Sequence, residues 1–336
     1  MRLFGERPRS LHAVLGLAVA TGTVVLGFSW ASITCFGQPG HGVPIKDSKQ
    51  ITVGGATIQV DFAEGVMDLP ETAVLSHIHA ATDAMLAYYG RFPVPKARIL
   101  VIPAPGRHGD LHGTTWGDMG GWPGFTRIGI GENMTTAELA DDWTMTHELV
   151  HMAFPSLADE KHWMEEGQAT YIEPIARVMT GELKAEDIWR DMVHDMPKGE
   201  PQTDDQGLDH THTWARTYWG GALFCLSADV EIRRETGNRK GLQDALRAVV
   251  AAGGTIDHEW DLVQALAIGD KATGTQVLSR MYAEGKDKPV TVDLPKLWQE
   301  LGIRSTPSGG VEFDDKAPLA NVRKSITSAS QHQPMT

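Results

Sequence analysis

The chain has 336 residues, of which 41% are hydrophobic, and its formal net charge at pH 7 is -13. A chain of this length can form a large core, and a typical domain size of about 150 residues suggests two lobes. The acidic composition argues against a general nucleic-acid-binding surface and favours solubility or cationic substrates. The chain has only 2 cysteines, which lie far apart, so a cysteine-rich structural zinc site is excluded.

Residues 1–36 have the pattern of an export segment. Three arginines precede an uncharged apolar run at residues 13–28, and small residues follow where a signal peptidase reads. Extended to Phe36, the run is also long enough to span a bilayer. We therefore expect a signal peptide or an N-terminal membrane anchor, and an exported protein that is periplasmic, extracellular or membrane-anchored with its folded part outside the cytoplasm. The residues before Cys35 make a poor lipid-attachment sequence, so a membrane-proximal linker is preferred to a lipoprotein.

Residues 37–156 are predicted to form an α/β sublobe. Alternating apolar residues at 51–62, interrupted by a Gly-Gly pair, predict a β-hairpin. The spacing of apolar residues at 71–89 indicates a helix. A short apolar run at residues 97–102 ends before a proline and predicts a buried strand.

A glycine-rich stretch at residues 107–124 is predicted to be a long irregular loop near a cleft, where it could shape specificity. His108 and His112 lie four residues apart in it, but the intervening glycines argue against a helix, so we interpret both as loop residues. Residues 125–131 predict a short strand at the edge of the sheet, against which an extended peptide could add its own backbone.

The most informative segment is HELVH at residues 147–151, an HExxH motif. On a helix, residues four apart project from the same face, so His147 and His151 can bind one metal ion. Glu148 lies close enough to act on a water molecule at that metal. Acidic and hydroxyl residues just before the motif are candidate helix-capping groups, and Pro155 ends the pattern. The segment therefore predicts a metal-binding helix that also carries a catalytic carboxylate.

A second helix is predicted to begin near Lys161 and to carry Glu166. Because the connection between the two helices is short, Glu166 can project back toward His147 and His151. Three protein ligands that leave one position for water are typical of catalytic zinc, whereas structural zinc sites have four protein ligands. We therefore predict one Zn²⁺ per chain, bound by His147, His151 and Glu166.

These motifs resemble those of the gluzincins, zinc peptidases in which HExxH is joined by a Glu from a following helix. The sequence WMEEGQATY at residues 163–171 is similar to their W-x-x-E-G block, and the resemblance implies Glu166 rather than Glu165 as the third ligand. The sequence TYWGGAL at residues 217–223 is similar to the Y-x-K-G helix of the catalytic domains of M1-type and M61 glycyl aminopeptidases (peptidase MA-like), with Gly220 in place of Lys. The resemblance implies that Tyr218 donates a hydrogen bond to the oxyanion and that the fold is a thermolysin-like zincin catalytic domain.

The predicted fold class is α+β: a small mixed sheet with an edge strand and the active-site helix, followed by a mostly helical lobe. Residues 157–305 are predicted to form the helical sublobe with the third zinc ligand, and residues 306–336 a C-terminal tail. The predicted helices of this sublobe cover residues 161–180, 185–195, 214–235, 240–252, 258–268 and 273–284.

The predicted function is hydrolysis of peptide bonds by an exported zinc metallopeptidase, either an aminopeptidase or an endopeptidase. Zinc would activate a water molecule, Glu148 would act as the general base, and Tyr218 would stabilise the oxyanion. Two alternatives stay open: a noncatalytic peptide- or envelope-binding protein with the same fold, and a zinc hydrolase of a non-peptide amide. The expected partner is a peptide or protein substrate and no nucleic acid, and any membrane attachment would use the N-terminal apolar segment. Composition leaves the oligomeric state open.

Other residues have competing interpretations. His210 or His212 could supply the oxyanion donor in place of Tyr218, or a second metal site. We interpret Cys225, in an apolar run, as a buried small hydrophobe. We interpret His77 and His79, in the first predicted helix, as structural histidines. Three further residues could orient the metal-binding imidazoles: Asp141, Thr170 and Glu173.

Overall fold

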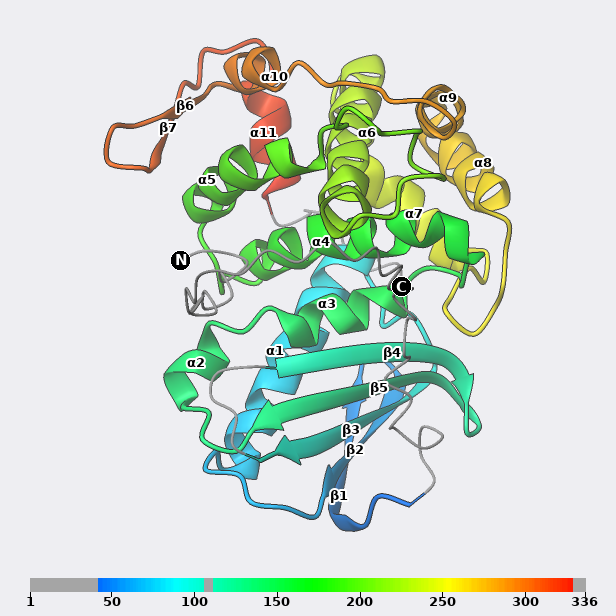
Figure 1. Ribbon diagram of the computed structural model, residues 1–336, viewed down its shortest axis with the longest axis vertical. Coiled ribbons are helices and arrows are strands. Elements are labelled where there is room, and N and C mark those ends of the chain that lie inside the picture. Colours follow the sequence, from blue (N-terminus) through cyan, green and yellow to red (C-terminus); the bar gives the residue numbers. More distant parts are fainter. Residues whose placement is uncertain (1–41, 106–110, 329–336) are drawn as a thin grey trace, which may run out of the picture.

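The computed structural model describes residues 42–105 and 111–328. A sheet and a helical lobe form two layers, with helix α3 (Thr144–His151) between them (Figure 1). The fold class is therefore α+β, as predicted. The predictions for residues 1–36 and for His108 concern positions outside the described ranges. Within those ranges, no helix combines the length and the apolar content required to cross a bilayer.

The sheet begins with the predicted hairpin of β1 (Ile45–Val53) and β2 (Ala56–Ala63). The φ angles of Gly54 and Gly55 are 55° and 84°, in the left-handed region that favours glycine, so this pair can form the tight turn. Helix α1 (Glu71–Tyr89) has the predicted bounds and leads to β3 (Lys96–Ala104), which pairs parallel to β2.

Two further strands complete a mixed sheet of five strands in the order β1-β2-β3-β5-β4. β5 (Trp122–Gly131) pairs parallel to β3, and β4 (Leu111–Met119) pairs antiparallel to β5. The prediction of an irregular loop at residues 107–124 is therefore wrong over most of its length, and His112 lies in a strand. The predicted strand at residues 125–131 is confirmed as part of β5, but its predicted place at the edge of the sheet is wrong, because β4 occupies that edge.

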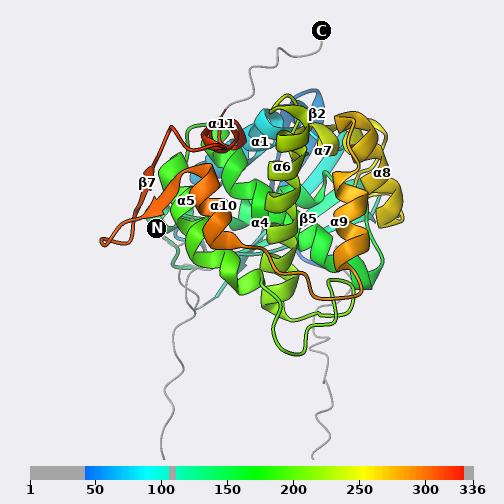
Figure 2. The same ribbon diagram turned by 90° about the horizontal axis from the view of Figure 1, so that it is seen from above.

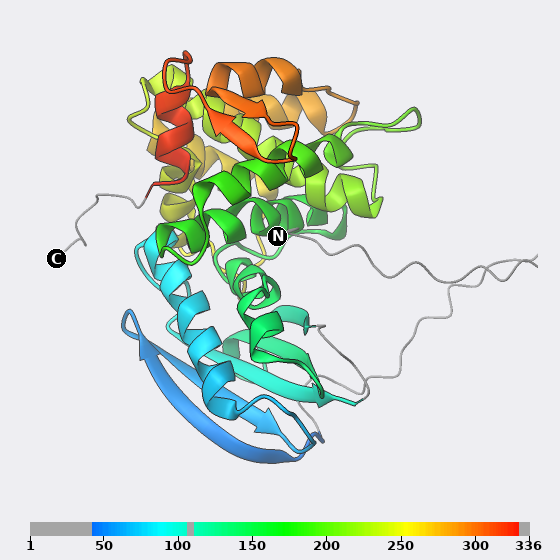
Figure 3. The same ribbon diagram turned by 90° about the vertical axis from the view of Figure 1, so that its left-hand side faces the viewer.

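One face of the sheet is covered by helices. Figure 3 shows α1 and α3 side by side against this face, below the helical lobe. The apolar side chains of α1 and of the strand face beneath it are buried in one large core. A smaller cluster around Leu100 and Phe125 lies in the same sheet but outside that core. A short helix, α2 (Thr136–Ala140), precedes α3 and is capped by a reciprocal pair of hydrogen bonds between Thr135 and Glu138.

The second lobe is mostly helical, as predicted. Its helices are α4 (His162–Met179), α5 (Ala185–Asp195), α6 (Gly221–Thr236), α7 (Leu242–Ala251), α8 (Leu262–Thr273), α9 (Val277–Gly285), α10 (Leu294–Leu301) and α11 (Ala320–Ile326). Seen from above, α6 runs through the middle of this lobe, with α8 and α9 on one side and α5, α10 and α11 on the other (Figure 2). α5 has the predicted bounds, while α8 and α9 each begin four residues after the predicted start.

The segment predicted as a C-terminal tail at residues 306–336 contains a strand and a helix, the last of which ends at Ile326. β7 (Val311–Phe313) pairs with β6 (Ile303–Ser305), and α11 packs beside α10. Arg323 of α11 is buried and donates hydrogen bonds to the carbonyl oxygens of Leu301 and Gly302, both at 2.9 Å. The polar composition of this segment gave no sign of these elements, because their few apolar side chains become buried only through packing on the helical lobe. The division of the chain into sublobes stays a prediction.

Candidate metal centre

The N-terminus of α3 is held by Asp142. Its carboxylate accepts hydrogen bonds from the backbone N–H groups of Thr144 at 3.0 Å and Met145 at 3.1 Å. Nε2 of His77 on α1 lies 2.9 Å from the same carboxylate. Burial acts to raise the pKa of Asp142, but His77 and the two N–H groups hold it below the usual value. The carboxylate therefore caps the helix that carries the HExxH motif and ties it to α1, and His77 is a structural histidine, as predicted.

We expect Asp142→Ala to lower the free energy of unfolding by about 1–2 kcal/mol, because two backbone N–H groups of α3 lose their acceptor. Urea denaturation followed by circular dichroism measures the difference, with the exposed neighbour Asp141→Ala as the control. The pKa of Asp142 is depressed in the folded state, so its contribution is present above the usual value of 3.8 and is lost as the pH falls below it. Equal losses of unfolding free energy in Asp142→Ala and Asp141→Ala would contradict the capping role of Asp142.

His147, His151 and Glu166 converge, and they form a group that could hold a metal ion. Nε2 of His147 lies 3.1 Å from Oε2 of Glu166, and Nε2 of His151 lies 3.8 Å from the same oxygen. Ligand atoms at about 2.0–2.1 Å from a tetrahedral zinc ion stand about 3.3 Å apart, so the donor set fits this metal. The three ligand atoms leave one coordination position open, as a catalytic site requires.

The Glu166 carboxylate is ionised at neutral pH. Burial acts to raise its pKa, but the neighbouring His151 and His147 hold the pKa at about 2. His162 also contributes to this effect. Glu165 points elsewhere and accepts a hydrogen bond from the backbone N–H of Leu157 at 3.1 Å. The geometry therefore places Glu166, and not Glu165, in the metal group.

Glu148 is buried beneath the edge strand β4. The hydroxyl of Thr115 lies 2.8 Å from Oε2 of Glu148 and can donate to it. At Gly113, an added Cβ atom would lie only 2.1 Å from Cγ of Glu148, so β4 can pass over this carboxylate only without a side chain there. Burial raises the pKa of Glu148, although His151 and Thr115 act in the opposite direction.

Tyr218 lies beside the metal group, on a π-helical turn (Arg216–Gly220) at the start of α6. Its ring centroid is 6.2 Å from that of His147, and the two rings are nearly parallel, at 15°. Burial and the nearby Glu166 carboxylate raise the pKa of Tyr218 well above its usual value, so the hydroxyl keeps its proton and can donate. Single π-helical turns within helices are frequent at functional sites.

A close crossing of α4 and α6 brings Tyr218 next to Glu166. An added Cβ atom at Gly167 would lie 2.2 Å from Cα of Gly221, and one at Gly221 would lie 2.1 Å from the carbonyl oxygen of Trp163. The two backbones touch because neither glycine has a side chain. Gly220, which stands where the resemblance expects Lys, faces the side chain of Arg216, so a larger residue would require Arg216 to move.

The other candidate residues lie apart from the metal group. His210 is paired with Asp287 at 2.9 Å, and His212 is exposed, so neither belongs to the metal-binding group found among the described residues. Cys225 is fully buried, as predicted, and burial raises the pKa of its thiol. None of the three candidates for orienting the imidazoles has a recorded contact with them among the described residues. Asp141 is exposed, Glu173 pairs with Arg177 at 2.9 Å, and the buried hydroxyl of Thr170 has no hydrogen-bond partner there.

Sequence reasoning missed Thr115, Gly113 and His162. Thr115 and Gly113 lie in the stretch interpreted as a loop, so nothing in the sequence connected them with Glu148. His162 lies 3.3 Å from Oε1 of Glu166, and a local signal was present, because the two residues are four apart on one helix.

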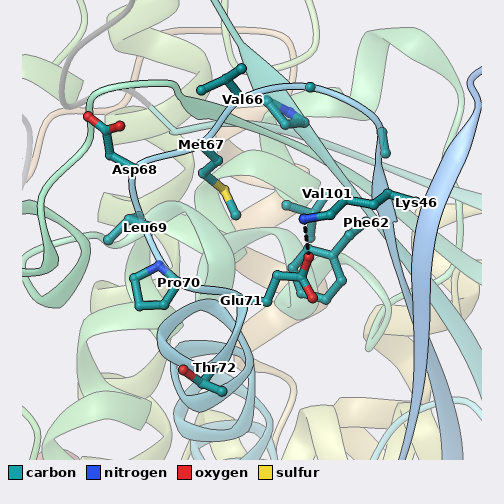
Figure 4. A pocket seen from close by; sticks show the side chains of 13 residues that line it. Lys46, Phe62, Val66, Met67, Asp68, Leu69, Pro70, Glu71, Thr72 and Val101 are labelled. Carbon is teal, nitrogen blue, oxygen red and sulfur yellow. Dashed lines mark hydrogen bonds and ion pairs between the residues drawn. The ribbon is translucent and has the colours of Figure 1, made fainter.

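A separate cavity of about 580 Å³ lies between the end of β2 and the start of α1 (Figure 4). Phe62 and Met67 line it, and an ion pair between Lys46 and Glu71 at 2.9 Å lies at its side. None of the residues that line this cavity belongs to the metal group. It is therefore not part of the candidate metal centre.

No protein-family model matches the chain, and a comparison with curated protein sequences finds no match. Among solved structures, an aminopeptidase N family protein from Idiomarina loihiensis matches 81% of the chain with a TM-score of 0.57 and 12% sequence identity. The match covers 51% of that protein, so the chain spans about half of its length.

An M1 zinc metallopeptidase from Deinococcus radiodurans also matches, with a TM-score of 0.47 and 16% identity over 74% of this chain and 53% of that one. A variant of an M1 zinc metallopeptidase from the same organism, bound to a Tyr-Ser-Ala substrate, has a TM-score of 0.48 and 15% identity over the same 74% and 53%. The likeness to the Idiomarina loihiensis protein supports a shared fold, in agreement with the gluzincin resemblance.

Proposed function

We propose that this protein is a zinc metallopeptidase that hydrolyses peptide bonds. The observation that carries the proposal is the convergence of His147, His151 and Glu166 beside the buried carboxylate of Glu148. A protein that only binds peptides has no need for a carboxylate held in place by Thr115 at this position. The thermolysin-like arrangement, in which an edge strand lies beside the metal-binding helix, belongs to the same proposal and is supported by the passage of β4 over Glu148.

Zinc bound to the three ligands would supply a Lewis acid that polarises the substrate carbonyl and lowers the pKa of water. Glu148 accepts a proton from the attacking water and delivers it to the leaving amine nitrogen. Its raised pKa, which burial causes, moves this carboxyl toward the range in which a group can both accept and release a proton near neutrality. Thr115 holds the carboxylate in place during the transfer.

The substrate backbone is proposed to lie along the free edge of β4. Among the described residues this strand pairs with β5 alone, so its other edge is available for hydrogen bonds to an extended peptide. Gly113 brings the edge next to Glu148, which places a bound peptide bond near both the carboxylate and the metal group. We propose that Tyr218, whose ring lies beside that of His147, donates to the oxyanion that develops from the carbonyl oxygen.

The N-terminal segment at residues 1–36 is proposed to direct export of the protein, with or without cleavage. Its positive start and apolar run support this proposal. Fractionation of cells that produce the full chain, followed by N-terminal sequencing, would locate the protein and report whether the segment is removed.

The test of the proposed function measures metal content and peptide hydrolysis together. We expect about one zinc per chain and cleavage of a mixed peptide library that stops when zinc is removed by a chelator and returns when zinc is added back. Peptides with free and with acetylated amino termini distinguish an aminopeptidase from an endopeptidase. Bound zinc without cleavage would contradict peptide hydrolysis, and absence of bound zinc would contradict the site itself.

We expect Tyr218→Phe to lower kcat/KM by about 10²–10³-fold, because the variant loses one oxyanion donor. Zinc content should equal that of the parent, since Tyr218 is not a ligand. Tyr89→Phe is a matched control, because the buried Tyr89 hydroxyl has no partner among the described residues. A large loss of kcat/KM in His212→Ala, with no loss in Tyr218→Phe, would assign the oxyanion role to His212 instead.

A further inference from the structure

The two oxygens of the Glu166 carboxylate have different partners. Oε2 faces the two histidines of the HExxH motif, at 3.1 Å from Nε2 of His147 and 3.8 Å from Nε2 of His151. Oε1 lies 3.3 Å from Nε2 of His162, the first residue of α4. Because His162 and Glu166 are four residues apart, one helical turn places the imidazole over the outer oxygen.

The ring of His162 is itself held in place. Its other nitrogen, Nδ1, lies 3.1 Å from Oε2 of Glu165. The second oxygen of Glu165 accepts a hydrogen bond from the backbone N–H of Leu157, in the connection between α3 and α4. A chain of contacts therefore runs from this connection through Glu165 and His162 to the outer oxygen of Glu166. Such contacts fix the orientation of a ring that would otherwise rotate freely.

A carboxylate can bind a metal through one oxygen or through both. Binding through both would use a coordination position that a catalytic zinc site leaves for water and substrate. A hydrogen-bond donor on one oxygen favours binding through the other, and partners of this kind typically change metal affinity or activity by about 10–100-fold when they are removed. Nε2 of His162 faces Oε1 at ion-pair distance, 3.3 Å, so His162 is the partner that could hold this oxygen.

We propose that His162 is a positioning residue that holds Oε1 of Glu166, so that this carboxylate binds zinc through Oε2 alone. The proposal rests on the proposed zinc site and adds a residue that neither the HExxH motif nor the W-x-x-E-G block contains. It also assigns a role to Glu165, whose carboxylate orients the His162 ring rather than binding the metal.

The position of His162 makes the proposal testable without loss of the fold. Its side chain is 54% exposed, whereas that of Glu166 is 10% exposed. Replacing a half-exposed side chain at the first residue of a helix leaves no buried cavity. A change in metal binding can then be attributed to the lost contact rather than to unfolding.

The experiment compares zinc affinity in His162→Leu, His162→Gln and the parent, by competition with a chromophoric chelator. We expect His162→Leu to bind zinc about 10–100-fold more weakly. His162→Gln should recover most of the affinity, because the amide nitrogen of Gln can reach the position of Nε2 and donate to Oε1. Cobalt-substituted samples give a second measurement: the visible absorption of four-coordinate Co²⁺ should weaken in His162→Leu, as the carboxylate takes a further position, and should be restored in His162→Gln.

The matched control is His194→Leu. His194 is also a helical histidine bonded to a carboxylate, at 2.6 Å from Asp195, and its side chain is 68% exposed. It lies on α5, outside the metal group, so zinc affinity should not change. Urea denaturation of the metal-free proteins should give equal free energies of unfolding for the parent and both His162 variants.

Unchanged zinc affinity and an unchanged cobalt spectrum in His162→Leu would overturn the proposal. Equal losses of zinc affinity in His162→Leu and His162→Gln would also overturn it, since the amide donor that Gln retains would then have no effect. A parent that binds zinc but cleaves no peptide would remove the proposed function, yet the affinity comparison would still support or refute the role of His162. A parent that binds no zinc would overturn both.

Discussion

Glu148→Gln is expected to lower kcat for peptide hydrolysis by about 10²–10⁴-fold, the contribution of a positioned general base. The amide has nearly the same shape as the carboxylate and can still accept a hydrogen bond from Thr115, but it cannot take a proton from water. Rates measured on one peptide substrate, with zinc content measured on the same samples, separate loss of the base from loss of the metal.

The control for this substitution is Glu160→Gln. Glu160 precedes α4 and its side chain is 53% exposed, so the same chemical change there should leave both the rate and the zinc content at the values of the parent. Retention of full activity in Glu148→Gln would show that another group takes the proton. Loss of zinc in Glu148→Gln would show that the carboxylate supports the metal rather than the chemistry.

His151→Ala is expected to reduce bound zinc from about one per chain to near zero, and hydrolysis should be lost with it. Two ligands would remain, which is fewer than the three protein ligands of a catalytic zinc site. The effect can be measured without any substrate, because a ligand that binds only the folded state stabilises it. Zinc at about 100 times its dissociation constant should raise the free energy of unfolding of the parent by about 2.7 kcal/mol and that of His151→Ala by far less.

His79→Ala is the control for the ligand substitution. His79 is exposed on α1, outside the metal-binding group, so its removal should leave the zinc-dependent stabilisation intact. Equal stabilisation of the parent and His151→Ala by zinc would contradict the assignment of His151 as a ligand. It would direct the search for the metal to a different group of side chains.

His147, His151 and Glu148 could be named from the sequence because their geometry is local, whereas the choice of Glu166 as third ligand followed from the resemblance to the gluzincins. His147 and His151 share one helical face whatever surrounds the helix, since residues four apart always do so. The bounds of α1 and α5 also followed from apolar spacing, which a regular amphipathic helix displays directly. In these segments, neighbours along the chain are sufficient to specify the structure.

The edge strand β4 could not be predicted in this way. Its glycines are typical of a loop when they are considered alone, but Gly113 and Gly117 are needed where the strand passes over other parts of the fold. An added Cβ atom at Gly117 would lie 2.0 Å from the carbonyl oxygen of Ile256, as one at Gly113 would meet Glu148. The reason for these glycines lies in segments far away in the sequence, and local propensity carries no information about them.

The proposed chemistry of this protein can be inferred from the sequence alone: two imidazoles and a carboxylate at the spacing of a zinc site, with a second carboxylate between the imidazoles. Which groups surround that site depends on how distant segments of the chain pack together. That packing brought Tyr218 beside His147 through the glycine contact of α4 and α6, left His212 exposed, and placed Thr115 against Glu148. Ligand spacing within a helix is a property of the backbone, whereas contacts between helices and strands depend on how buried surfaces fit together.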